Sequence, residues 1–240
     1  MPKISQFTNK QFLITPEKSD LPIQPDWFNA QYWKQKNAIS GQSVGRNTTY
    51  FFDYNHQSYV LRHYYRGGLI GKIANDGYFY FGLKRSRVYR EFALLEQMKA
   101  LDLPVPTPIA ARLTRCAHLY SADIIMHQIA DATDVFHLLK TVPLDNLTWQ
   151  NIGKTIAQFH QAGVFHADLN IHNIMLDKTS KVWIIDFDRG HFKAPAKAWQ
   201  QNNLNRLLVS LKKEVEKQTH FYFKQDNWQA LLKGYQAYQC

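Results

Sequence analysis

Long hydrophobic runs and cysteines are both scarce in this chain of 240 residues. Its first 20 residues contain only Phe12, Leu13 and Ile14 as an apolar run, whereas a secretory signal needs about 7–15 apolar residues and a membrane-spanning helix about 20. No apolar run of either length occurs anywhere in the sequence, so we expect a protein that is soluble or at most peripheral to a membrane. The two cysteines, Cys116 and Cys240, are too few for a disulfide framework, which predicts a reducing, cytoplasmic environment.

Acidic residues are also few, with 19 Asp and Glu against 29 Lys and Arg, and the formal net charge is +10. Such an excess favours an anionic partner, either nucleic acid, phosphorylated lipid or a nucleotide. The basic residues are spread along the chain and no nucleic-acid-binding motif is present, so we expect no nucleic-acid partner. Repeats and low-complexity tracts are absent, and 45% hydrophobic residues indicate a globular protein.

The predicted elements change in kind along the chain. The first 30 residues contain four prolines and predict an irregular arm, and the aromatic cluster at its end favours core packing. The first half is then rich in β-forming residues, and the second half shows helical spacing. We expect an α+β protein in a single domain, 1–240, with two lobes. Residues 1–130 form a β-rich N-lobe with the arm, and residues 131–240 form a shortened helical C-lobe. Strands are predicted at 48–52, 58–64, 109–113, 120–126 and 182–185, with a turn at 55–56. Three helices are predicted: one at 88–98, one that begins at a cap, Thr148, and ends at Gly163, and one at 204–215.

The strongest chemical signal is the run His166-Ala-Asp168-Leu-Asn170-Ile-His172-Asn173, followed by Asp186-Phe187-Asp188 after a hydrophobic strand. Phosphoryl transfer needs a carboxylate that orients the attacking hydroxyl and ligands for the Mg²⁺ ion that neutralises phosphate charge. These runs resemble the catalytic loop H-x-D-x-x-x-x-N and the metal loop D-F-G of the protein kinase-like superfamily. The resemblance implies that Asp168 is catalytic and that Asn173 and Asp186 hold Mg²⁺.

The same resemblance implies a site for ATP in the first half of the chain. Gly41 and Gly45 flank a candidate phosphate-covering loop, because glycines let backbone N–H groups approach phosphates. Arg62 stands where the superfamily has a strand lysine, and Glu91 is its candidate partner on the predicted helix. By analogy, residues near Val60 and over 126–129 flank the adenine.

Two departures from the superfamily pattern restrict the substrate and the metal loop. Asp188 replaces the glycine of D-F-G, and only 52 residues follow it, without an A-P-E sequence. Protein kinases use that region to bind peptides, so we expect a small-molecule or glycolipid acceptor and no protein substrate. Arg189 offers a positive charge near the acceptor, or is simply an exposed charge.

Each assignment has a structural alternative. Asp168 is otherwise a loop cap, Arg62 a surface strand residue, and the glycines of 41–45 an ordinary turn. His166 is expected to brace the loop rather than react, while Asn170 and His172 either touch the substrate or fill the loop. His160, His166 and His172 recur every six residues, but that spacing does not place them on one helix face, which disfavours a metal site.

A narrower resemblance rests on three runs, Leu61-Arg62-His63-Tyr64-Tyr65-Arg66-Gly67-Gly68-Leu69, residues 166–173, and Ile185-Asp186-Phe187-Asp188-Arg189-Gly190. From about residue 35 to the end, the chain resembles the lipopolysaccharide kinase family of Gram-negative bacteria, in which Arg62 is the normal residue. The resemblance implies ATP- and Mg²⁺-dependent phosphorylation of 3-deoxy-D-manno-octulosonic acid (Kdo), at its 4-hydroxyl, on the Kdo-lipid A precursor. It places the enzyme peripherally on the cytoplasmic face of the inner membrane, where +10 suits an anionic surface.

Candidate membrane or glycolipid contacts are the segment 66–90 and the aromatic residues Trp27, Phe28 and Trp33, although core packing is favoured for the two tryptophans. Two other functions stay open. The chain is alternatively a kinase for another inner-core sugar such as heptose, or for a soluble amine-bearing molecule. From a different class, it is a catalytically silent kinase-like scaffold that binds anionic glycolipid, which Arg62 and Asp188 permit and the intact Asp168, Asn173 and Asp186 disfavour.

Overall fold

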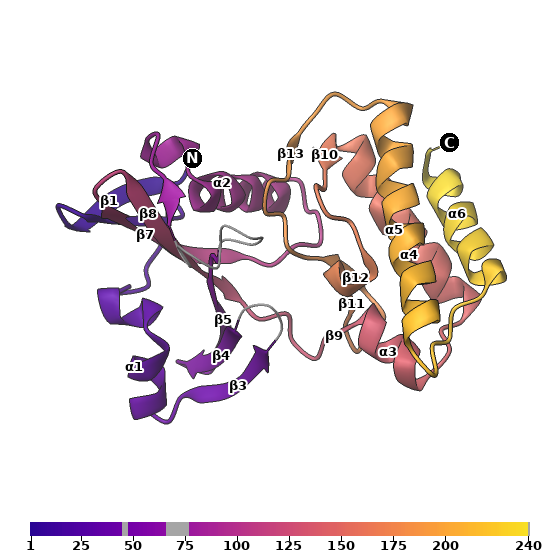
Figure 1. The fold of residues 1–240 in the computed structure, drawn as a ribbon, viewed down its shortest axis with the longest axis horizontal. Coiled ribbons are helices and arrows are strands. Elements are labelled where there is room, and N and C mark those ends of the chain that lie inside the picture. Colours follow the sequence, from indigo (N-terminus) through magenta and orange to yellow (C-terminus); the bar gives the residue numbers. More distant parts are fainter. Residues whose placement is uncertain (45–47, 66–76, 240) are drawn as a thin grey trace. The chain divides into compact units, whose positions relative to one another are not determined.

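The computed structural model describes residues 1–44, 48–65 and 77–239. The chain divides into two compact units (Figure 1), the first formed by Met1–Gln97 and Pro106–Gln128 and the second by Met98–Val105 and Ile129–Cys240. The first unit is mostly sheet and the second mostly helix, as the α+β prediction requires.

A single antiparallel sheet dominates the first unit. Among the described residues its strands follow the order β1-β2-β7-β8-β5-β4-β3, and β6 pairs with the outer part of β8. The sequence-predicted strands appear as β4, β5, β7 and β8. Three of them extend beyond their predicted bounds, whereas β5 begins and ends one residue earlier than predicted. The strands are β1 (Lys3–Thr8), β2 (Gln11–Thr15), β3 (Ile39–Val44), β4 (Thr48–Tyr54), β5 (Gln57–His63), β6 (Tyr78–Phe79), β7 (Pro108–Cys116) and β8 (Leu119–His127).

The expectation of an irregular arm over the first 30 residues is wrong. Residues 3–15 form the β1–β2 hairpin, and β2 extends the sheet by pairing with β7 from Gln11↔Thr114 to Ile14↔Ala111. The four prolines lie outside these strands, where the missing N–H groups cost no ladder bonds. Backbone pairing with a distant strand therefore decides the structure of this segment.

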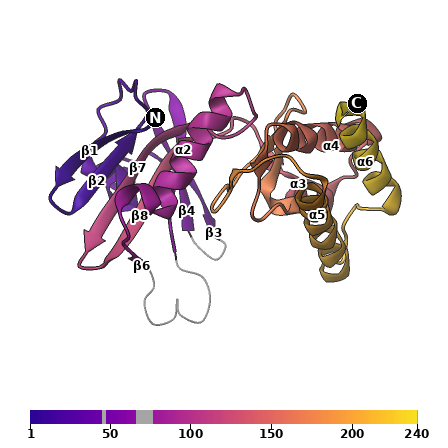
Figure 2. The ribbon, with the colours of Figure 1, turned by 90° about the horizontal axis from the view of Figure 1, so that it is seen from above.

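Both faces of the sheet are covered. Ile124 and Ile125 are neighbours on β8, point to opposite faces and are both fully buried. Figure 1 shows α1 (Ala30–Gln35) and α2 (Arg87–Ala100) on opposite sides of the sheet. Figure 2 shows that α2 lies across the strands. The predicted helix 88–98 is confirmed as α2, and its buried side chains are Val88, Tyr89, Glu91, Phe92, Leu94, Leu95 and Met98.

The aromatic residues at the end of the N-terminal segment belong to the core. Trp27, Phe28 and Trp33 are each at most 4% exposed, and Trp33 stacks on Phe52 with ring centroids 4.1 Å apart. The Trp33 indole N–H also donates to the backbone oxygen of Trp27 over 2.8 Å. The favoured core reading of the tryptophans is confirmed, and their role as membrane contacts is wrong because they are buried.

Glycine placement differs from expectation in the hairpin of β3 and β4. Gly41 lies inside β3 and pairs with Phe51 at a β-bulge, so the prediction that it belongs to a loop is wrong. A Cβ atom at Gly41 would make an ordinary contact at 3.5 Å with Phe51, so the fold does not demand glycine there. Gly45 lies outside the described residues, as do residues 66–76 of the segment 66–90.

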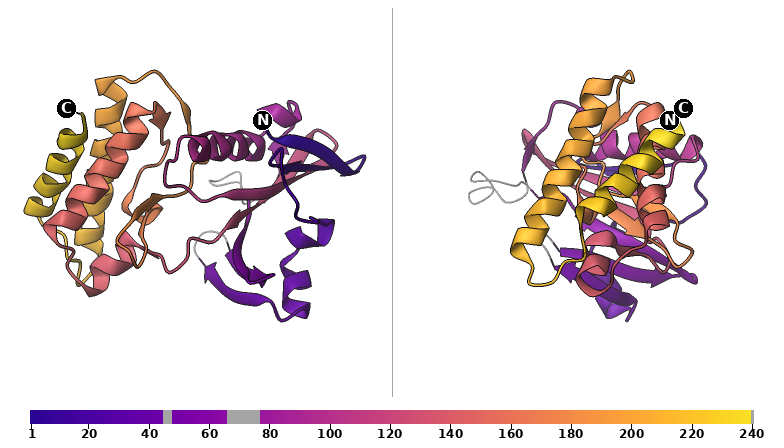
Figure 3. Two further views of the ribbon diagram at one scale, coloured as in Figure 1. Left: turned by 180° about the vertical axis from the view of Figure 1, so that it is seen from behind. Right: turned by 90° about the vertical axis from the view of Figure 1, so that its right-hand side faces the viewer.

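The second unit is built around three helices and two small antiparallel sheets. Figure 3 shows α4, α5 and α6 grouped together, and α4 and α6 pack closely. A Cβ atom at Gly153 of α4 or at Gly234 of α6 would lie about 2 Å from a backbone oxygen of the facing helix, so only glycine permits this approach. The elements are β9 (Thr133–Asp134), α3 (Val135–Thr141), α4 (Asn146–Gln161), β10 (Val164–Phe165), a short 3₁₀ turn η4 (Ile171–Asn173), β11 (Ile174–Leu176), β12 (Val182–Ile184), β13 (His191–Phe192), α5 (Lys197–Lys217) and α6 (Gln225–Gln239).

The predicted C-terminal end of α4 is confirmed, and its predicted N-cap is wrong. Asp145, rather than Thr148, is the N-cap, because its carboxylate accepts the N–H of Thr148 over 2.7 Å. Gly163 ends the helix with a φ of +74°, as predicted for a glycine after a C-cap. In the part of the chain that the structure describes, no helix is long and apolar enough to cross a bilayer.

Candidate active site

The β11–β12 hairpin brings the candidate metal-binding residues together. Asn173 immediately precedes β11 and Asp186 closely follows β12, and antiparallel pairing places these two ends side by side. The N–H of Ile185 donates to the backbone oxygen of Asn173 over 3.0 Å, which fixes this end of the hairpin. The hairpin therefore holds the residue before β11 close to the segment that follows β12.

The backbone around Asp168 is held by amide side chains. The Asp168 carbonyl oxygen accepts hydrogen bonds from Nδ2 of Asn170 and Nδ2 of Asn173, over 2.9 and 3.0 Å. Its backbone N–H donates to Nδ1 of His166 over 3.1 Å. With both backbone groups occupied, the segment is rigid while the Asp168 side chain remains 45% exposed. Asp168 is thus not a loop cap, because its carboxylate receives no backbone N–H from the described residues.

His166 braces the segment, as expected. Its Nδ1 accepts from Asp168, so the proton sits on Nε2, which donates to the backbone oxygen of Ile185 over 3.0 Å. Burial lowers the pKa of His166, which favours this neutral form. One imidazole ring therefore ties the segment carrying Asp168 to the segment carrying Asp186.

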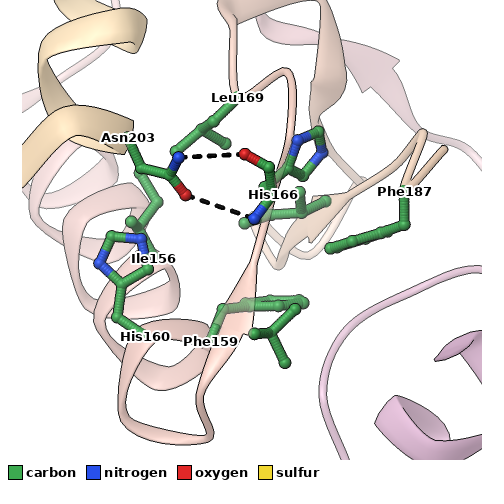
Figure 4. A pocket seen from close by; sticks show the side chains of 9 residues that line it. Ile156, Phe159, His160, His166, Leu169, Phe187 and Asn203 are labelled. Carbon is green, nitrogen blue, oxygen red and sulfur yellow. Dashed lines mark hydrogen bonds between the residues drawn. The ribbon is translucent and has the colours of Figure 1, made fainter. Parts of the chain in front are cut away.

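Phe187 anchors the metal-loop segment in the core of the second unit (Figure 4). Its ring is fully buried and lies 5.6 Å from the Phe159 ring and 4.7 Å from the His166 ring. The cavity among these side chains encloses only about 10 Å³, so it belongs to the core and holds no ligand. Asp186 itself has a φ of +61°, an unusual conformation for a non-glycine residue that often marks functional sites.

Helix α5 supplies four side chains that sequence reasoning missed. Asn203 bonds both backbone groups of His166, as Figure 4 shows, and Arg206 forms an ion pair with Asp168. Ser210 accepts the N–H of Ile171, and Glu214 pairs with His172. The available signal was their spacing of three, four and four residues, a polar stripe beside the leucine face. His172 therefore has a structural partner, as does Asn170 through its bond to Asp168.

A second charged cluster lies within the first unit. Arg62 on β5 donates from Nη2 to Oε1 of Glu91 on α2 over 2.6 Å, and Tyr64 donates to Oε2 over 2.5 Å. The Glu91 side chain is 1% exposed and that of Arg62 20%, so Arg62 is not a plain surface residue. Burial first, and then the charge of Glu91, raises the pKa of Tyr64 well above its usual value, which keeps the hydroxyl a donor.

Two further predicted positions, Val60 and Arg189, lie in a strand and in a turn. Val60 on β5 pairs with Met126 on β8, and Arg189 is exposed with a φ of +63°. The three spaced histidines take separate partners, since Nδ1 of His160 lies 2.7 Å from the hydroxyl of Tyr235. Among the described residues, no group of three or more His, Cys, Asp or Glu side chains could hold a metal ion.

These groups match the needs of phosphoryl transfer. Nδ2 of Asn173 donates a hydrogen bond to the backbone oxygen of Asp168, so Oδ1 of Asn173 is the side-chain atom that could bind a cation. Asp186 is the candidate carboxylate ligand. Amide and carboxylate oxygens are the ligands that Mg²⁺ prefers, so the donor set fits this ion. Arg62, fixed by Glu91, is a guanidinium suited to phosphate oxygens.

Comparison with known proteins gives consistent results. The family model described as "Lipopolysaccharide kinase (Kdo/WaaP) family" matches residues 30–235. A 3-deoxy-D-manno-octulosonic acid kinase of Vibrio parahaemolyticus is 41% identical over 89% of this chain and 90% of its own length. The enzyme of the same name from Mannheimia succiniciproducens is 40% identical over 96% and 98%, and that from Haemophilus influenzae 39% identical over 88% and 90%. Among solved structures, the Cydia pomonella granulovirus kinase PK-1 aligns with a TM-score of 0.46 and 14% identity over 71% of this chain and 58% of that chain.

Proposed function

The chain belongs to the lipopolysaccharide kinase (Kdo/WaaP) family, and we propose that it transfers the γ-phosphoryl group of ATP to the 4-hydroxyl of Kdo on the Kdo-lipid A precursor. The observation that carries this proposal is the rigid presentation of Asp168 beside Asn173 and the Asp186 segment. The names of the relatives support Kdo as the sugar.

Asp168 is the proposed catalytic carboxylate. It accepts a hydrogen bond from the Kdo hydroxyl and orients the oxygen for in-line attack on the γ-phosphorus. As the new O–P bond forms and the bond to the β–γ bridging oxygen breaks, the hydroxyl proton passes to Asp168 and ADP leaves. The partial exposure of Asp168 allows a sugar to reach it, while its fixed backbone keeps the geometry.

Asn173 and Asp186 would hold Mg²⁺, which neutralises charge on the phosphate oxygens when bound. The contribution of the chain is to fix these two ligands on one hairpin end and to restrain the Asn173 amide through its bond to Asp168. Arg62 would bind the ATP phosphates, and the buried Glu91 carboxylate holds its guanidinium in place. Gly45 remains a proposed phosphate-loop residue, and Gly41 is proposed as an ATP-binding position on the strand β3. Val60 and residues 126–129 are proposed neighbours of adenine.

A membrane contact is proposed for the β6 surface, defined by Phe79, Phe81, Lys84, Arg85 and Arg115. Phe79 is 55% and Phe81 72% exposed, with ring centroids 6.3 Å apart. The residue between these two phenylalanines in the sequence is Tyr80. The guanidinium carbon of Arg115 lies 4.8 Å from the centroid of the Tyr80 ring. Exposed aromatic rings bordered by cations suit the interface of an anionic bilayer, where the precursor resides.

Vesicle binding tests this surface. The double variant Phe79→Ser/Phe81→Ser should bind phosphatidylglycerol-containing vesicles at least about tenfold more weakly, because each buried ring contributes roughly 1.5–3 kcal/mol. Leu147→Ser, which removes an apolar side chain 65% exposed on α4, is the matched control and should bind normally. Equal binding by both variants would exclude the β6 surface as the contact.

The function itself is tested by an acceptor series. Purified protein is incubated with labelled ATP and Mg²⁺ and with Kdo-lipid A precursor, a heptose-bearing inner-core acceptor, or no acceptor. Label on Kdo alone is expected. Label on heptose instead would assign another inner-core sugar, and ATP binding without transfer to either would favour the silent scaffold.

A further inference from the structure

One face of α5 contacts the catalytic segment, residues 166–173, at four points. Residues 203, 206, 210 and 214 share this face, and they bond His166, Asp168, Ile171 and His172 in matching order. Three of these contacts involve backbone groups or a bracing side chain. Only Arg206 touches the carboxylate that would meet the acceptor.

The ion pair between Arg206 and Asp168 is one-sided. Nε and Nη2 of Arg206 both donate to Oδ1 of Asp168, over 2.9 and 2.5 Å. Within the described part of the chain, Oδ2 of Asp168 accepts no hydrogen bond and Nη1 of Arg206 donates none. The Arg206 side chain is 55% exposed, so the guanidinium edge formed by Nη1 and Nη2 is open to a ligand.

An acceptor with its own carboxylate poses an electrostatic problem at this point. Kdo brings a negative charge toward Asp168, and two carboxylates in contact repel each other unless a cation lies between them. A guanidinium is suited to that position because its two edges bind two carboxylates bidentately. Arg206 already binds Asp168 by one edge.

We propose that Arg206 binds the carboxylate of the acceptor sugar through its Nη1–Nη2 edge while its Nε–Nη2 edge holds Oδ1 of Asp168. The acceptor hydroxyl then meets the open Oδ2. This inference rests on the proposed function, and it makes Arg206 a specificity residue that selects acidic sugars over neutral ones such as heptose.

A cross of protein and substrate variants tests the proposal. Wild type, Arg206→Gln, Arg206→Lys and Lys212→Gln are assayed on Kdo-lipid A precursor and on its Kdo methyl ester. Lys212 is exposed on the opposite face of α5 and is the charge-matched control. Wild type and Lys212→Gln should prefer the acid over the ester by about tenfold to a hundredfold, mainly through KM, since charged hydrogen bonds are worth roughly 1.5–3 kcal/mol.

Arg206→Gln should lose most of this preference. Its activity on the ester should fall because Asp168 loses its ion pair, and its activity on the acid should fall further. Arg206→Lys should recover part of the preference, because it restores the charge without the bidentate edge. If Arg206→Gln instead loses activity by the same factor on both acceptors, Arg206 only positions Asp168 and the proposal is overturned. Absence of transfer by wild type on either acceptor would instead overturn the proposed function, and this inference with it.

Discussion

Asn203 offers the sharpest test of how α5 supports the catalytic segment. Its amide is 3% exposed and bonds both backbone groups of His166, accepting from the N–H over 3.4 Å and donating to the carbonyl over 3.0 Å. Asn203→Leu preserves the side-chain volume but removes both partners. The N–H and C=O of His166 are then left buried without a hydrogen bond.

The cost follows from these two bonds. Each unsatisfied buried polar group costs about 1–3 kcal/mol of folding stability, and the longer bond contributes at the low end of that range. We therefore expect Asn203→Leu to lower the free energy of unfolding by about 2–4 kcal/mol. For a chain of this size, 1 kcal/mol corresponds to roughly 2–4 °C in the unfolding midpoint, which gives a decrease of about 4–16 °C. Phosphate transfer should also fall, because His166 positions Asp168.

Thermal and urea unfolding measure the effect. Asn202→Leu makes the same chemical change at the neighbouring exposed position of α5 and should shift the midpoint by little. If Asn203→Leu unfolds at the same temperature as Asn202→Leu, the amide does not hold the segment and the reasoning is refuted.

Three further outcomes are expected. Gly234→Ala should destabilise the fold by about 1–3 kcal/mol or more in urea unfolding, because the new Cβ would lie 2.0 Å from the backbone oxygen of Gln150. Burial lowers the pKa of His160 to about 4 in the folded state, so the unfolded state binds more protons as the pH falls from about 6.5 to 4. Stability should therefore fall by up to about 3 kcal/mol across that window, and an unchanged slope in His160→Gln would contradict this cause. Glu91→Gln should raise the KM for ATP about tenfold or more by releasing Arg62, and an unaltered KM would show that the pair does not serve ATP.

The sequence predicted what depends on local order along the chain. Asp168 and Asn173 are five residues apart and are joined directly by a hydrogen bond, so their proximity is visible in the spacing. The strands and helices with strong periodicity were found for the same reason. Arg62 and Glu91 lie 29 residues apart, and only the family resemblance suggested their pairing.

Long-range pairing explains what the sequence did not reveal. Residues 3–15 become strands because β2 meets β7 about 100 residues later, and Gly41 is drawn into β3 by β4. The contacts of Asn203 and Arg206 span 37 and 38 residues. Their spacing shows that they share one face of a helix, but it does not show what that face contacts. The α4 cap was misplaced because Asp145 and Thr148 are both competent caps, and only the geometry selects between them.

The claim that Asp168 carries the transfer is tested most directly by Asp168→Asn, compared with wild type and with Asp226→Asn, an exposed control on α6. The measurement is single-turnover transfer of labelled phosphate from Mg·ATP to the Kdo-lipid A precursor, with ATP affinity determined separately. The account predicts a rate lower by about 10²–10⁴ for Asp168→Asn with ATP affinity retained, and a normal rate for Asp226→Asn. A normal rate in correctly folded Asp168→Asn would contradict it.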